Sequence, residues 1–61
     1  MDQYIVRVEN KYGDFWLGQR VYTSRESAIV VKHNVADTGR YSRVYIRVAT
    51  PEQIATALSI L

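Results

Sequence analysis

The sequence predicts an α+β fold, in which a three-stranded antiparallel sheet carries two helices packed on one face. Three segments alternate between apolar and polar side chains with the period of two that is typical of half-buried strands. Two other segments begin with the capping signals of helices, which gives the element order ββαβα. No linker, repeat or low-complexity tract occurs, so residues 1–61 are expected to form a single small domain.

The first two predicted strands form a hairpin. Residues 3–11 make the first strand, and a turn follows over residues 10–14, in which Gly13 is free to adopt a positive φ angle. The second strand is predicted over residues 15–22. Its core side is expected to begin with Phe15, because the alternate positions include a charged residue and a glycine.

The first helix is predicted to follow the second strand. With Thr23 as the N-cap, Glu26 stands at the third helical position and completes a capping box. Gly39 is the natural residue just beyond the C-terminal end of this helix. The β-branched run at residues 29–31 favours a strand by intrinsic propensity and therefore opposes the assignment.

A third strand and a second helix complete the chain. Residues 41–49 show the clearest alternation in the sequence. After them, Thr50 is a suitable N-cap, Pro51 suits the first helical position, and Gln53 can close the capping box. A helix this short is marginal alone, so it must dock on the rest of the protein. Its apolar stripe consists of Ile54, Ala55, Leu58 and Leu61, with Ala57 and Ile60 alongside.

The predicted strands define two sheet faces. We expect the strand order 2-1-3, because the alternation of the first strand suits a central position; the rival order places the third strand beside the second. The core face, which both helices would cover, collects Tyr4, Val6, Val8, Phe15, Leu17, Val21, Val44, Ile46 and Val48. The opposite face collects Ile5, Arg7, Glu9, Trp16, Arg20, Tyr22, Arg43, Tyr45 and Arg47.

The opposite face is the strongest functional signal in the sequence. Its candidate partner-binding residues are Trp16, Arg20, Tyr22, Arg43, Tyr45 and Arg47. One interpretation is a solvated face on which arginine stems cover aromatic rings, and a second is a protein interface, since Trp, Tyr and Arg are enriched in hot spots. A third is single-stranded nucleic-acid binding by stacking and phosphate contacts. The fourth is that the alternating residues are assigned to the wrong faces of the sheet, an error of parity that would turn Trp16 and Tyr22 toward the core.

We expect a non-catalytic protein-binding module, acting as a small inhibitor or adaptor. Nucleic-acid binding through the same face is the alternative. Three observations weigh against it: the net charge is only +2, Glu9 lies among the arginines, and the RNP1 pattern of RNA recognition motifs is missing. A structural homodimer, formed through the same face or the last helix, is a third possibility. In size and element order the chain is similar to small phage and mobile-element proteins that bind and block host factors, which implies a viral inhibitor; no family motif carries this similarity.

The sequence contains little that favours catalysis, a cofactor or a metal. His33 is the only histidine, and no carboxylate shows metal-ligand spacing with it. The serines lack a nucleophile motif, and no phosphate-binding loop occurs. We therefore expect no enzymatic activity, no cofactor and no metal. Because the chain has no cysteine, no apolar segment of membrane-spanning length and no signal-peptide start, a cytoplasmic protein without membrane contact is expected.

Overall fold

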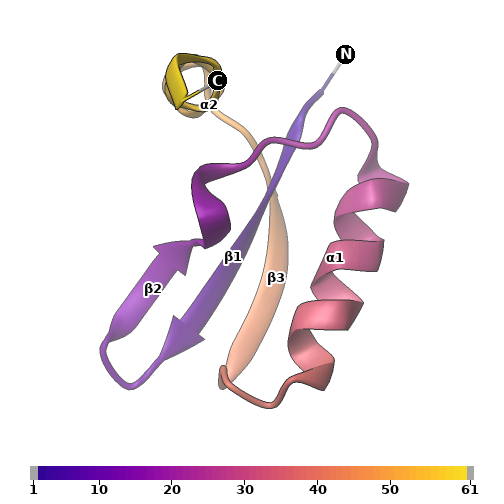
Figure 1. The fold of residues 1–61 in the computed structure, drawn as a ribbon, viewed down its shortest axis with the longest axis vertical. Helices are drawn as coiled ribbons and strands as arrows, with labels where there is room; N and C mark the ends of the chain where they lie inside the picture. The colour runs from indigo at the N-terminus through magenta and orange to yellow at the C-terminus, as the bar shows by residue number, and fades with distance from the viewer. Residues whose placement is uncertain (1, 61) are drawn as a thin grey trace.

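The computed structural model describes residues 2–60 and contains an antiparallel three-stranded sheet with two α-helices (Figure 1). The elements are β1 (Tyr4–Asn10), β2 (Gly13–Trp16), a 3-10 turn η1 (Leu17–Gln19), α1 (Arg25–Asp37), β3 (Arg43–Val48) and α2 (Pro51–Ile60). The strand order is β2-β1-β3, with β1 in the centre. The predicted α+β class and the preferred order are therefore confirmed, and the rival order is wrong.

The hairpin between β1 and β2 closes through a tight turn. Asn10 pairs with Gly13 across the two strands, and the side-chain oxygen of Asn10 accepts a hydrogen bond from the Tyr12 N–H at 2.7 Å. Gly13 has a φ of +139°, a backbone conformation that other residues rarely adopt. The predicted turn and the reason for its glycine are confirmed.

The second strand is shorter than predicted. β2 ends at Trp16, and in η1 the residues Gly18 and Gln19 adopt φ angles of +65° and +52°, which no strand can contain. The chain rejoins the sheet only at Tyr22, which exchanges two backbone hydrogen bonds with Tyr4 at 2.8 and 2.7 Å. Directly opposite residues point to the same face, so Tyr22 shares the face of Tyr4 rather than that of Trp16.

Helix α1 covers the sheet over β1 and β3. Its N-cap is Ser24, one residue later than predicted, whose hydroxyl oxygen accepts a hydrogen bond from the Ser27 N–H at 3.4 Å. Its C-terminal end matches the prediction, because Gly39 follows with a φ of +69°. The β-branched residues 29–31 are helical although Val30 is exposed, since the packing of the half-buried Ile29 and Val31 and of the buried Ala28 outweighs a small intrinsic preference for strands.

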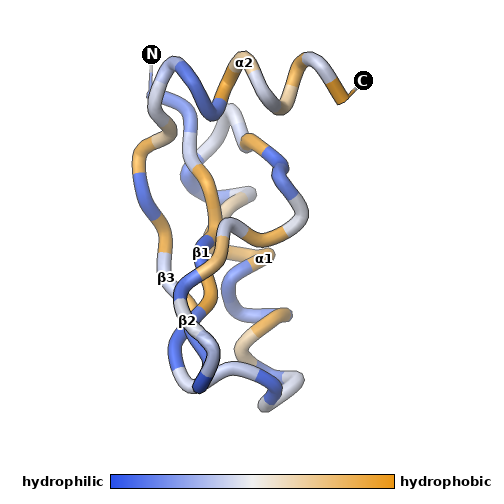
Figure 2. Tube along the Cα trace, turned by 90° about the vertical axis from the view of Figure 1, so that its left-hand side faces the viewer, coloured by the Kyte–Doolittle hydropathy of each residue, from blue (hydrophilic) through white to orange (hydrophobic). Residues whose placement is uncertain are grey.

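Helix α2 begins with the predicted capping box but does not cover the sheet face as predicted. The Gln53 N–H donates to the Thr50 hydroxyl at 3.2 Å, and the Thr50 N–H donates to the Gln53 side-chain oxygen at 2.9 Å, so the capping box is confirmed. Figure 2 shows α2 on the same side of the sheet as α1 but across its end, where it contacts η1 instead of covering the sheet. No residue of Pro51–Ile60 is buried, and the predicted stripe residue Leu61 lies outside the described residues. Within residues 2–60 the buried apolar residues are Ile5, Val6, Val8, Ala28 and Ala49.

Candidate binding face

The sheet face opposite α1 is defined by the cross-strand register. Arg7 on β1 is paired with Trp16 on β2 and with Tyr45 on β3, so these three side chains form one row across the sheet. The neighbouring rows pair Glu9 with Asp14 and Arg43, and Ile5 with Arg47. We call this surface the open face; it consists of Ile5, Arg7, Glu9, Asp14, Trp16, Arg43, Tyr45 and Arg47.

Tyr45 lies at the centre of a cation–π cluster on β3. The guanidinium carbon of Arg43 is 4.5 Å from the centroid of the Tyr45 ring, and that of Arg47 is 5.5 Å from it. Alternate residues of a strand point to the same face, so both arginines reach the ring from its own strand. The ring is therefore occupied by this chain's own cations before any partner arrives.

Asp14 connects β2 to the rest of the open face. Its carboxylate accepts hydrogen bonds from the Tyr45 hydroxyl and from the Nε of Arg7, the latter at 2.7 Å. The Tyr45 hydrogen bond, together with Arg7, holds the pKa of Asp14 below its ordinary value. The hydrogen bond that Arg7 donates to Asp14 in turn raises the pKa of Arg7. Asp14 thus remains ionised at neutral pH and neutralises one of the three arginines on this face.

Sequence reasoning missed Asp14, which it assigned to the turn alone. A usable signal existed, because Asp14 stands two residues before Trp16 and so shares its parity if the strand begins at Gly13. The prediction began the strand at Phe15 and left the carboxylate outside it.

Trp16 ends β2 at the edge of the open face. Its indole N–H donates a hydrogen bond to the Arg20 carbonyl at 3.0 Å, which ties the ring to the segment after η1 and leaves it half-buried. This bond fixes one orientation of the indole. Trp16 is the one large aromatic residue that β2 contributes to the open face.

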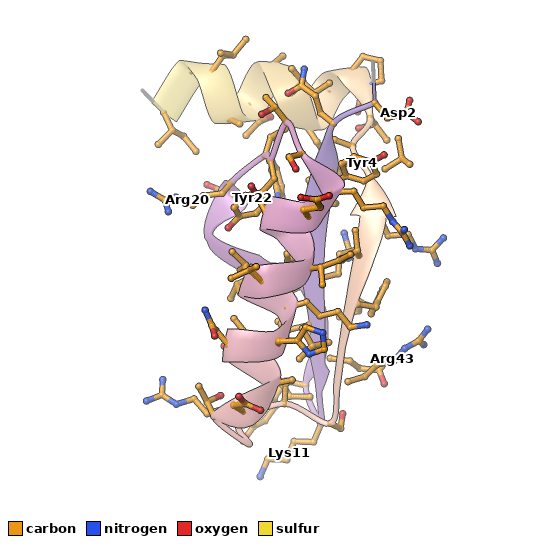
Figure 3. All side chains as sticks on the ribbon, turned by 90° about the vertical axis from the view of Figure 1, so that its right-hand side faces the viewer. Asp2, Tyr4, Lys11, Arg20, Tyr22 and Arg43 are labelled. Atoms are coloured by element: carbon orange, nitrogen blue, oxygen red, sulfur yellow. The ribbon has the colours of Figure 1, made fainter. Side chains whose placement is uncertain are left out.

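Four of the six predicted partner-binding residues lie together, and two do not. Trp16, Arg43, Tyr45 and Arg47 share the open face. Arg20 lies in an exposed segment after η1, and Tyr22 pairs with Tyr4, so the prediction that both belong to this face is wrong. Figure 3 shows Arg20 and Tyr22 on the side of α1, with Arg43 pointing out on the other side. The parity error foreseen as an alternative is thus real for Tyr22 and absent for Trp16.

No protein-family model, curated protein or solved structure significantly matches this chain. Inference about function therefore rests on the chemistry of its own side chains.

The open face is mixed in polarity and in charge. Ile5 is only 1% exposed, and it lines a shallow hollow with Arg7, Tyr45 and Arg47. Thr50 and Gln53, at the start of α2, complete the rim of this hollow. Three arginines face two carboxylates, Glu9 and Asp14, so the surface is mildly basic at most. Such a surface suits a partner that offers a few carboxylates and contacts for the Trp16 and Tyr45 rings.

The rest of the described chain adds no group suited to metal chemistry. Among residues 2–60, no three His, Asp or Glu side chains lie close enough to hold a metal ion. His33 is exposed on α1, away from the open face. Neither helix of the described part has the length and apolar character needed to cross a membrane.

Proposed function

We propose that this protein is a non-catalytic protein-binding module that acts through the open face, as a small inhibitor or adaptor. The observation that carries the proposal is the convergence of Trp16, Tyr45 and the arginines on the sheet face opposite α1. Trp, Tyr and Arg are the residue types that dominate the energetics of protein interfaces. The pairs around Tyr45 also pre-orient these side chains, which lowers the entropy lost on binding.

The charge pattern favours an acidic protein surface as the partner. Arg43 and Arg47 are exposed, and among residues 2–60 neither has a carboxylate within ion-pair distance. A planar guanidinium pairs best with a carboxylate in a bidentate geometry, so a partner with two acidic side chains fits this strand. The shallow hollow between Tyr45 and Arg47 would accept a side chain of the partner beside these carboxylates.

Single-stranded nucleic acid is the weaker candidate on the same face. Base stacking needs a free ring, whereas both arginines of β3 lie near the ring of Tyr45 and the indole of Trp16 is half-buried. Arg7 is already paired with Asp14, which leaves two unpaired arginines on the face for phosphates. Two phosphate contacts are too few for a strong electrostatic track.

The test begins with capture of partners from a cell lysate, with and without nuclease. Arg47→Ala and Tyr45→Ala should each weaken binding of a captured protein, and nuclease should have no effect. The matched control is Arg40→Ala, which removes an exposed arginine from the loop after α1, outside the open face. The control should bind as tightly as the natural chain.

Salt dependence separates the two partner classes. Two phosphate contacts on a single strand predict a slope of about −1.4 in a plot of log affinity against log salt concentration. A desolvated protein interface should show a shallower dependence. Binding of a generic single-stranded oligonucleotide at about 0.15 M salt, lost in Tyr45→Ala and kept in Arg40→Ala, would contradict the protein-binding proposal.

A further inference from the structure

Helix α2 is apolar, yet none of its residues is fully buried, and only Gln53, Ile54 and Ala57 are half-buried. Leu58 is 66% exposed and Ile60 is 58% exposed. Its main contact with the described chain is η1, a single short turn. A helix of this length is marginal by itself, so its stability in water requires more apolar contact than η1 provides.

The dimensions of the molecule also indicate a missing partner. The accessible surface is 4584 Å² for a mass of 7.0 kDa. Compact monomers of that mass expose about 4,000 Å². The radius of gyration is 11.3 Å, against about 10.5 Å for a compact domain of this length. The whole molecule thus exposes about 500 Å² more than a compact monomer of its mass, and the exposed Leu58 and Ile60 of α2 contribute to this excess; each partner in a standard interface buries ~800 Å².

We propose that α2 pairs with α2 of a second copy of this chain, antiparallel and across a twofold axis. Such an interface is isologous, so the same residues serve both sides. In the antiparallel arrangement Leu58 of each copy packs against the small side chain of Ala55 of the other, and the helix dipoles oppose each other favourably. Ile54, one turn before Leu58, extends the apolar contact along the helix.

The charge of α2 favours a second copy over other partners. After Glu52 the sequence contains no ionisable side chain, so two copies meet without like-charge repulsion. The same absence gives an acidic or basic partner nothing to pair with. A membrane surface fits poorly, because helices that lie on membranes carry Lys or Arg along their polar face.

This pairing is independent of the proposed function. Leu58 and Ile60 are not part of the open face, so a dimer through α2 presents two open faces at once. A partner with two binding sites would then gain avidity without any new contact on either face.

The oligomeric state tests the proposal directly. Sedimentation or light scattering should report a dimer, and Leu58→Glu should weaken dimerisation by at least about tenfold, because it places two charges at the pairing surface. The matched control is Val30→Glu, since Val30 is a 58% exposed apolar residue of α1, away from α2. The control should remain dimeric. A natural chain that is monomeric up to about 1 mM, or equal dissociation of both variants, would overturn the proposal.

A cross-linking measurement keeps the test decisive if Leu58→Glu fails to fold. The natural sequence has no cysteine, so Ala55→Cys provides a unique thiol on α2. A short bis-maleimide reagent should join two copies of this variant. Arg40→Cys, in the loop after α1, should not be joined. Equal cross-linking of the two variants, or none in either, would refute pairing through α2.

Discussion

Two identical substitutions on the core face test how this small core is stabilised. Val6 and Val48 lie on the same face of the sheet, but Val6 is 0% exposed on the central strand whereas Val48 is 54% exposed at the end of β3. Val→Ala removes the same atoms at both sites. The two sites differ in burial, so the difference between their losses in free energy of unfolding measures how much burial stabilises this sheet.

The expected magnitude follows from the atoms removed. Val6→Ala loses two buried carbon groups, worth about 1.6 kcal/mol in transfer free energy, and the residual cavity brings the loss to about 2–3 kcal/mol. Val48→Ala leaves no closed cavity and should cost less than about 1 kcal/mol. A domain of this length has a free energy of unfolding of only about 3–9 kcal/mol. Val6→Ala should therefore remove about a fifth of it or more.

Urea denaturation measures both effects at one protein concentration. Trp16 is the only tryptophan, and its half-buried indole should report unfolding by fluorescence. With a slope near 1 kcal/mol per molar urea, Val6→Ala should lower the midpoint by about 2–3 M, and Val48→Ala by less than about 1 M. Equal midpoint shifts at unchanged slope would refute the assignment of Val6 to the core and Val48 to its margin.

Three further outcomes are expected. Thr50→Ala should lower the free energy of unfolding by about 1 kcal/mol through loss of the N-cap, while Thr50→Ser should restore most of it. Arg43→Glu on the open face should leave the protein folded, whereas Val8→Glu on the core face should unfold it by burying an unpaired charge, because Val8 is 2% exposed; circular dichroism distinguishes the two. Because the pKa of Asp14 is lowered in the folded state, its contribution to stability should be present above its unfolded pKa, about 3.9, and be lost as the pH falls through the lower folded value. Asp14→Asn should flatten that acid limb of a stability–pH profile, and an unchanged limb would show that the carboxylate is not held by Tyr45 and Arg7.

The open face combines local and long-range contributions. The arginines on either side of Tyr45 follow from the alternation of a single strand, and the sequence alone predicts that they share its face. The contact of Tyr45 with Asp14 joins β3 to β2 across the central strand, over 31 positions of the chain. No local pattern specifies such a contact, because it depends on the register of two separate strand pairs.

Local signals determined most of the secondary structure. Gly13 and Gly39 each adopt a positive φ angle, the first in the hairpin turn and the second just after α1, and glycine adopts such an angle without strain. At the start of α2, Thr50 and Gln53 bond to backbone N–H groups that the helix itself leaves free. Each of these effects acts within a few residues, so the sequence by itself predicts them. The alternation of β1 and β3 likewise predicted both faces of the sheet correctly.

Only the tertiary structure decided where β2 ends and where α2 lies. The prediction extended the second strand through residues 17–22, whereas the backbone turns in η1, because a sequence pattern of side-chain types does not record backbone direction. Tyr22 faces α1 because its hydrogen bonds with Tyr4 outweigh that pattern. The capping box sets the start of α2, but its direction depends on the short link after β3 and on contact with η1. Long-range pairing thus placed Arg20 and Tyr22 away from the open face and brought Asp14 into it.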